Sequence, residues 1–347
     1  MWKTLRRLGS GIGGIEALKT DVENNKADIK AIEHRLLDFE RYRSSLQALN
    51  KLLDQSAAGS LAQLLRQTRD AAVLDHLGAF PITVESVFGL QTPGTNPRGL
   101  LLNAVPKAGS YLLLELMKTF GGFTDCRHHT YTESLRRRND DGSFDQERVI
   151  PALVWLAALK PGLMCVSHTE YGALIEQYIL SRKDDLKAIF IIRDPRDLVI
   201  SWADFVFQSK SYPQMTAWNA FQQQQGRIHH STDEQRISAS IEGLLSSEIR
   251  NYIPWIHSPA CLTIRFEDLY NAINSQKSDV LDRLTDYLEI PRKPSSELAA
   301  ALGRGLTSSG RTDKVGVFRS RMSAAQLERI KQPDFHRLVL EYGYGRE

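Results

Sequence analysis

The chain has 347 residues, of which 42% are hydrophobic and 24% are charged, a composition typical of globular proteins. Its 44 Lys and Arg residues against 41 Asp and Glu residues leave a net charge of +3, too small and too dispersed for a nucleic-acid binder. The length suits one α/β catalytic domain of about 250 residues with an appendage. Because the net charge is this small, any anion site must be formed by a few basic residues close together.

The cysteine pattern and the N-terminus bear on location. Three cysteines without CxxC spacing indicate neither a disulfide framework nor a zinc site, and they favour a reducing compartment. No apolar signal core follows Met1, and no run of about 18 apolar residues occurs, so we expect a cytoplasmic protein without a transmembrane segment. Trp2, Leu5 and Leu8 lie among basic residues and could touch an anionic membrane surface; a frayed basic start is the alternative.

Apolar residues recur at alternating steps of three and four between residues 15 and 53, the spacing of a coiled-coil seam. Asn25, Arg43 and Asn50 interrupt it, and polar seam residues usually fix register or partner number. We predict a helical region over 1–90, with a coiled coil at about 15–53 that makes the protein a homo-oligomer. The alternative is a long helix folded back on the catalytic domain, with a second amphipathic helix from Leu61 to Leu77.

The run QTPGTNPR at residues 91–98 is dense in Pro, Gly and Asn and predicts a linker or turn, so we expect the catalytic domain over 98–347. After it, short apolar runs alternate with helical stretches. This order predicts a three-layer α/β/α fold with a central, mainly parallel sheet. The predicted strands are residues 100–105, 163–166, 188–192 and 261–266.

The first apolar run leads into Pro106-Lys107-Ala108-Gly109-Ser110 and then into an apolar helix. A tight turn from a strand to a helix N-terminus directs backbone N–H groups and the positive end of the helix dipole at one spot, which favours an anion. Gly109 permits close approach, Lys107 adds a charge and Ser110 offers a hydroxyl. The lack of GxxxxGK argues against a Walker A site. The alternative is a β-α turn with a solvated lysine.

A second strand-to-helix junction begins at Arg193, with Asp194 placed to cap the helix. Ligands of open α/β sheets bind outside the carboxyl ends of the strands, where a guanidinium can hold a phosphate through two hydrogen bonds. Ser201, two helical turns later, could reach the same group. We interpret Arg196 and Asp197 as surface helix charges.

Together these segments resemble the PAPS-dependent sulfotransferase family, in which a PKSGTTW-like loop holds the 5′-phosphosulfate and an RxPxDxxxS-like segment holds the 3′-phosphate. Residues 166–168, 264–269 and 311–319 are similar to the family's histidine-bearing strand end, its YEDL segment and its RKGxVGDW segment. The resemblance covers roughly residues 98–347 and implies a P-loop nucleotide-hydrolase-like fold. Leu112 replaces an aromatic that usually stacks on adenine, Asp313 replaces a glycine, and Val317-Phe318 replaces Asp-Trp.

The resemblance also implies residue roles. Lys107 would stabilise the bridging oxygen and the leaving phosphate, and His168 would take the acceptor's proton as general base. Glu170 is the alternative base, because some carbohydrate-acting relatives use a glutamate. No metal is needed. The donor-binding residues implied are Lys107, Ala108, Gly109, Ser110, Tyr111, Leu112, Arg193, Ser201, Phe266, Arg311 and Lys314.

The implied activity is in-line transfer of a sulfuryl group from PAPS to a hydroxyl or amine of a saccharide, a lipid or another small molecule, with release of PAP. Two alternatives stay open: another P-loop-like nucleotide-dependent transferase or kinase, and a catalytically degenerate scaffold. We interpret His128 and His129 as solvated loop residues, with contact to an acceptor as the alternative. The basic run Arg136–Arg138 could attract an acidic acceptor, although such runs are usually solvated. Trp202 and Phe205, at helical spacing, are interpreted as core residues.

Overall fold

The structure is a computed structural model that describes residues 83–131, 134–139, 144–150, 152–208, 232–246, 248–275, 279–308 and 315–345. The predicted coiled coil at 15–53 lies outside these residues, as do Arg311 and Lys314. Within the described ranges, no helix has the length and apolar character needed to cross a membrane.

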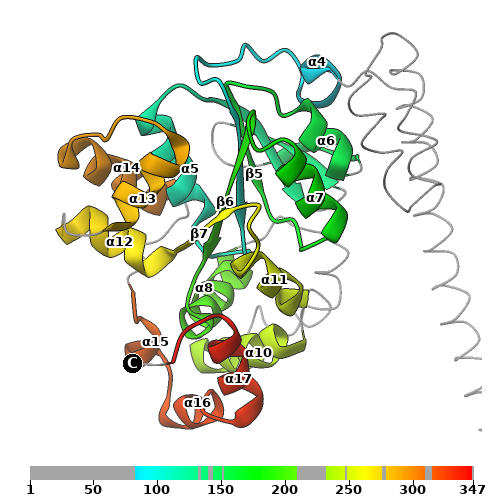
Figure 1. Ribbon diagram of the computed structural model, residues 1–347. Coiled ribbons are helices and arrows are strands. Elements are labelled where there is room, and N and C mark those ends of the chain that lie inside the picture. The colour runs from blue at the N-terminus through cyan, green and yellow to red at the C-terminus, as the bar shows by residue number, and fades with distance from the viewer. Residues whose placement is uncertain are drawn as a thin grey trace, which may run out of the picture.

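The described residues include a seven-stranded sheet in the order β4-β3-β2-β5-β1-β6-β7 (Figure 1). Strands β2, β5, β1, β6 and β7 pair in parallel, and β3 and β4 extend the sheet antiparallel at one edge. The mainly parallel sheet is thus confirmed, with the four predicted strands as β1, β5, β6 and β7. The strands are β1 Gly99–Ala104, β2 Thr124–Tyr131, β3 Ser134–Arg138, β4 Phe144–Val149, β5 Leu163–Ser167, β6 Leu186–Ile192 and β7 Leu262–Arg265.

Helices cover both faces of the sheet, which gives the three predicted layers (Figure 1). One face is covered by α5 (Ser110–Phe120), α12 (Phe266–Ser275), α13 (Asp279–Leu288) and α14 (Ser295–Ser308). The other core cluster draws on α4 (Val84–Phe88), α6 (Ala152–Ala158), α7 (Ala173–Ser181), α8 (Pro195–Gln208), α10 (Asp233–Ser246), η1 (Glu248–Tyr252), α11 (Ile253–Ile256), α15 (Phe318–Arg321) and α17 (Pro333–Glu341). Helix α16 spans Ala324–Arg329.

Strand β1 shows why its sequence is a continuous apolar run. Leu100 and Leu102 belong to the core cluster on the α5 side, whereas Leu101 and Val105 belong to the cluster on the opposite side. Successive side chains of a strand point to opposite faces, so a strand covered on both faces needs apolar residues on both, and Asn103 near the carboxyl end is the exception in β1.

The segment at 91–98, expected as a linker or turn, packs against the amino end of the sheet. The Gly94 N–H donates to the Gly162 carbonyl at 2.9 Å, and the Asn96 N–H donates to the Gly122 carbonyl at 2.8 Å. A Cβ at Gly94 would lie 2.4 Å from the Gly122 oxygen, so only glycine allows this approach. Helix α4, which precedes the segment, contributes buried side chains to the core.

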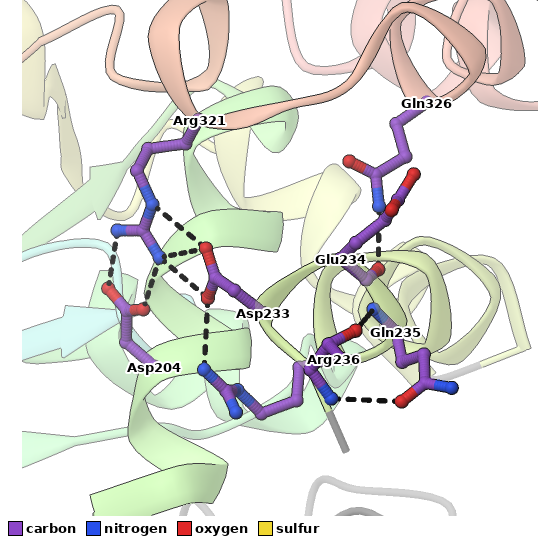
Figure 2. A network of polar contacts seen from close by, with 8 residues as sticks. Asp204, Asp233, Glu234, Gln235, Arg236, Arg321 and Gln326 are labelled. Carbon is purple, nitrogen blue, oxygen red and sulfur yellow. Dashed lines mark hydrogen bonds and ion pairs between the residues drawn. The ribbon is translucent and has the colours of Figure 1, made fainter.

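A network of polar contacts fastens the C-terminal helices to α8 and α10 (Figure 2). Arg321 of α15 binds Asp204 of α8 at 2.9 Å and Asp233 of α10 at 3.0 Å. Gln326 of α16 donates to the Glu234 carbonyl at 2.6 Å. Helix α8, which follows the second predicted anion junction, is thereby held by segments more than one hundred residues later in the chain.

Candidate functional site

Lys107 and Arg193 lie at the same end of the sheet, where the parallel strands β1 and β6 finish at their carboxyl ends. Strands β1 and β6 are parallel neighbours whose register pairs Ala104 with Ile191, and the Val105 N–H donates to the Ile191 carbonyl at 3.3 Å. Because both strands finish at this end, the two strand-to-helix junctions start side by side. The structure therefore brings together the two anion sites predicted from distant parts of the sequence.

The loop between β1 and α5 has the backbone of an anion nest. Lys107 has φ 71° and Gly109 has φ 107°, both in the left-handed region, and the Ala108 N–H donates to the Val105 carbonyl at 2.9 Å. Such turns orient successive N–H groups into a concave site, and a non-glycine residue with positive φ is often found at functional sites. Gly109 is the N-cap of α5 and has no side chain to cap it. The first-turn N–H groups have no acceptor within the helix.

Phe266, at the start of α12, links this loop to Arg193. A Cβ at Gly109 would lie 2.6 Å from the Phe266 ring, so the loop backbone rests directly on the phenyl group. The guanidinium carbon of Arg193 lies 4.6 Å from the centroid of the same ring. Three residues predicted from separate motifs thus form one contact cluster.

The Lys107 side chain reaches helix α8, where its Nζ lies 3.5 Å from the centroid of the Phe205 ring. The interpretation of Phe205 as a core residue was therefore wrong, because its ring is only half-buried and contacts the loop lysine. An ammonium over an aromatic face is stabilised by the ring quadrupole, which holds Lys107 in place.

The junction after β6 confirms one local prediction and corrects another. Asp194 caps α8, since its Oδ1 accepts the Arg196 N–H at 2.9 Å. Asp197, interpreted as a surface charge, is 1% exposed and accepts the N–H groups of Gly316 at 2.6 Å and Phe318 at 3.0 Å. The interpretation failed because these partners come from a segment far along the chain. Arg196 forms an ion pair with Asp194 at 2.5 Å.

The Asp197 carboxylate also lies in the field of Arg193. Burial raises the pKa of Asp197, and the charge of Arg193 and the two backbone N–H bonds oppose that rise. A buried carboxylate with these partners ties residues 316–318 to α8. That segment directly follows Arg311 and Lys314, which lie outside the described residues.

His168, directly after β5, is held through both its ring and its backbone. Its Nδ1 lies 2.7 Å from the Ala104 carbonyl at the end of β1. Its N–H donates to the Thr130 carbonyl at 2.7 Å, and its carbonyl accepts the Tyr252 hydroxyl at 2.9 Å. A carbonyl oxygen only accepts, so Nδ1 carries the ring proton and Nε2 is the nitrogen that can accept one.

The environment of His168 keeps the imidazole neutral. Burial and, to a lesser extent, the charge of Lys107 lower its pKa to about 4, although the bond to Ala104 opposes that change. The neutral ring leaves Nε2 free of a proton, so this nitrogen can accept a hydrogen bond from a hydroxyl.

Asn103 holds the backbone of Thr169, the residue that follows His168. This role of Asn103 was not identified from the sequence. Its Nδ2 donates to the Thr169 carbonyl at 3.0 Å, and its Oδ1 accepts the Thr169 N–H at 2.9 Å. Trp255 donates from Nε1 to the same carbonyl at 3.0 Å. The available signal was a polar residue at the carboxyl end of an otherwise apolar strand.

Glu170, the alternative base, is engaged elsewhere. Its Oε2 accepts a hydrogen bond from Asn251 of η1 at 2.8 Å. His168, by contrast, contacts the end of β1, from which the Lys107 loop starts. The geometry thus favours His168 as the proton acceptor.

His128 and His129 lie in β2, so the interpretation as solvated loop residues was wrong. The Nδ1 of His128 lies 2.6 Å from the Cys126 carbonyl, and burial lowers the pKa of His128. His129 is 2% exposed, and its ring centroid lies 4.5 Å from that of His168. His129 therefore adjoins the candidate base, whereas the His128 ring centroid lies 5.4 Å from that of Phe88 in α4.

Arg136 and Arg138 are buried in β3, whereas Arg137 between them is exposed, as strand alternation requires. Arg136 binds Glu147 of β4 at 3.0 Å, and Arg138 binds Asp125 of β2. The solvated interpretation therefore holds for Arg137 alone.

The other predicted donor-binding residues that the structure describes lie in the loop after β1, at the start of α5 and in α8. Ala108, Ser110 and Ser201 are buried, and Tyr111 is half-buried. The Leu112 side chain is 2% exposed and packs in the core beside α14. Any contact of Leu112 with a nucleotide would therefore come from its backbone.

One family model and several solved structures match the chain. Residues 97–301 match the family model described as sulfotransferase domain. No curated protein sequence matches the chain significantly. A mouse sulfotransferase, SULT7A1, complexed with PAP is 15% identical with a TM-score of 0.38, covering 75% of this chain and 93% of that one.

Two structures of retinol dehydratase also match the chain. The complex with retinol and PAP is 12% identical, and the complex with androsterone and PAP is 11% identical. Both have a TM-score of 0.39 and cover 74% of this chain and 84% of the other. At these identities and TM-scores, the ligands of those proteins are not assigned to the present chain.

Proposed function

The chain belongs to the sulfotransferase domain family, and on that premise we propose that it transfers a sulfuryl group from PAPS to a hydroxyl or amine acceptor, releasing PAP. The observation that carries this proposal is that the Lys107 loop and Arg193 follow neighbouring parallel strands and lie together at the carboxyl end of the sheet. A saccharide, a lipid or another small molecule is the acceptor class, and the cytoplasm, where thiols stay reduced, is the proposed location.

The residues present fit a nucleotide with phosphates at both ends. The loop with Lys107 and Gly109 in left-handed conformations suits the 5′-phosphosulfate, since its backbone is concave and a Cβ at Gly109 is excluded by Phe266. Arg193 suits the 3′-phosphate. We assign Ser201, Arg311 and Lys314 to the same phosphate, with Asp197 holding the segment that follows Lys314.

We assign each of the chain's own groups a separate role in the transfer. PAPS supplies a sulfuryl group attached to a phosphate leaving group. Lys107 and the N–H groups at the start of α5 stabilise the negative charge that develops on that phosphate. The Nε2 of His168 accepts the proton of the attacking hydroxyl, and the hydrogen bonds to Ala104, Thr130 and Tyr252 hold it in place.

Calorimetric titration with PAP tests the donor site. Lys107→Ala and Arg193→Ala should each weaken PAP binding about tenfold to hundredfold, because each removes a charge-assisted contact. Lys331→Ala, at an exposed lysine outside the site, is the charge-matched control and should bind PAP as the wild type does.

The same titration separates the alternatives. A wild-type protein that does not bind PAP refutes the proposed function. Tighter binding of ATP with magnesium than of PAP indicates a kinase or another transferase. Normal PAP affinity without transfer of labelled sulfate to any acceptor in a broad panel indicates a degenerate scaffold.

A further inference from the structure

Buried polar atoms without partners gather beside His168. Both ring nitrogens of His129 are buried with no hydrogen-bond partner, and so are Nε of Arg136 and Nη1 of Arg138 within the described part of the chain. A buried donor or acceptor left unpaired is costly, and native proteins keep few of them unless a ligand completes the site.

These three side chains form one cluster. The β2–β3 register pairs His129 directly with Arg136, and strand alternation places Arg138 on the same face. Tyr131 stacks on His129 with ring centroids 5.0 Å apart, and its ring lies 5.3 Å from the Arg136 guanidinium carbon. Tyr111, the second residue of α5, bridges the other side, 6.2 Å from the His129 ring and 5.8 Å from the Arg138 guanidinium carbon.

The cluster begins where the acceptor must lie. The His129 ring centroid is 4.5 Å from that of His168, and the Tyr131 centroid is 5.1 Å from it. A hydroxyl that gives its proton to His168 therefore places the adjoining part of its molecule against His129 and the aromatic rings.

The unpaired groups are mostly hydrogen-bond donors, and the charge around them is positive. Arg136 is balanced by Glu147, but Asp125 is shared by Arg138 and by Lys118, which lies 3.4 Å away. Burial, the neighbouring His168 and the charges of Arg138, Arg136 and Lys107 hold the pKa of His129 well below its usual range, so its neutral ring offers one donor and one acceptor. Carboxylate and sulfate oxygens are the partners that guanidinium donors bind best.

On the premise of the proposed function, we propose that the acceptor carries an anionic oxygen group, a carboxylate or a sulfate, beside its reacting hydroxyl, and that His129, Arg136 and Arg138 bind this group. The cluster thus selects acidic acceptors over neutral ones of the same shape.

Binding to PAP-saturated protein tests this selectivity. The probes are 4-nitrophenyl β-glucuronide with its matched β-glucoside, and 4-hydroxybenzoate with 4-hydroxybenzamide, each pair differing in the carboxylate. Calorimetry should show at least tenfold tighter binding of one or both carboxylates. Equal affinities within both pairs, tighter binding of the neutral members, or no binding of either carboxylate overturns the inference.

Variants locate the selectivity. Arg138→Gln should remove at least tenfold of the carboxylate affinity and leave the neutral probe unchanged, and Arg138→Lys, which keeps the charge beside Asp125, checks that the loss is not misfolding. Arg137→Gln, exposed on the same strand, is the matched control and should retain the full preference. If Arg138→Gln folds and keeps the preference, the inference is wrong.

His129→Phe separates binding from structure. Phenylalanine keeps the aromatic contacts with Tyr131 and His168 and removes two unpaired nitrogens, so the variant should melt at the same or a higher temperature while losing carboxylate preference. A lower melting temperature with intact preference shows a structural histidine and overturns the assignment. A wild-type protein that does not bind PAP would refute the proposed function instead. Calorimetry with PAP alone, without an acceptor probe, measures this separately.

Discussion

The proton on Nδ1 of His168 is held by the Ala104 carbonyl, which leaves Nε2 as the basic nitrogen. We predict that His168→Gln lowers kcat about 10²- to 10⁴-fold, the usual contribution of a general base, with unchanged PAP affinity. Glu170→Gln should lower kcat only slightly, because Glu170 is bound to Asn251. Transfer of labelled sulfate from PAPS measures both. A larger loss in Glu170→Gln would identify Glu170 as the base.

Buried neutral histidines also make stability depend on pH. The pKa values of His128, His129 and His168 are all lowered by burial. The unfolded chain therefore binds protons at a higher pH than the native protein, and stability should fall as pH drops below about 6.5. For His168 the loss continues until about pH 4, where the native ring also protonates.

We expect that His168→Gln removes about 3 kcal/mol of the pH-dependent loss in unfolding free energy between pH 7 and pH 4. Urea unfolding at a series of pH values measures it, and His336→Gln at an exposed position is the control. A His168→Gln variant with the same pH slope as the wild type would contradict the buried, neutral state of His168.

At the scale of elements, helix α5 offers a matched pair of glycines. Gly109 at its N-cap has φ 107°, and a Cβ there would meet Phe266 at 2.6 Å; Gly121 at its C-cap has φ 79° and open space. Gly121→Ala should cost about 1–3 kcal/mol of stability, because φ 79° with ψ −179° is a conformation that only glycine adopts readily. Gly109→Ala should cost more, because the loop or Phe266 must move.

Only Gly109→Ala should also weaken PAP binding, since only that glycine lies in the anion loop. Thermal unfolding and calorimetry with PAP measure the two effects. A folded Gly109→Ala variant that binds PAP as the wild type does would show that the loop does not hold the donor.

Strand β2 and the hairpin of β3 and β4 beside it were missed by the sequence reasoning. The residues of the hairpin alternate poorly, because Arg136 and Arg138 occupy buried positions where apolar residues are expected. Their charges are tolerated through Glu147 and Asp125 on the neighbouring strands. Only strand pairing reveals those partners, so this edge of the sheet could not be predicted.

At the scale of the whole molecule, the predicted coiled coil at 15–53 lies outside the described residues and stays a prediction. Deleting residues 1–55 should convert an oligomer to a monomer in light scattering while PAP affinity is retained. Leu36→Glu on the seam should have the same effect, and Leu37→Glu beside the seam should not. An unchanged mass in the deletion and in Leu36→Glu would contradict the coiled coil.

Sequence alone determined the parts of the molecule whose cause is local. Apolar runs of strand length, the Pro and Gly of the loop after β1 and the capping Asp194 specify their elements through neighbours in the chain. The four predicted parallel strands and the two strand-to-helix junctions followed from that order, and with them the family.

Tertiary structure decided which polar residues are buried. Asp197 depends on N–H groups of residues 316 and 318, Asn103 depends on Thr169, and His129 lies among Arg136, Arg138 and His168. The physical reason is that burying a polar group is costly unless hydrogen-bond or charge partners meet it, as they do for Asp197 and Asn103, or a ligand completes the site, as we propose for His129. Those partners come from other strands and helices, so it is the packing of the sheet that places His129, Arg136 and Arg138 beside His168.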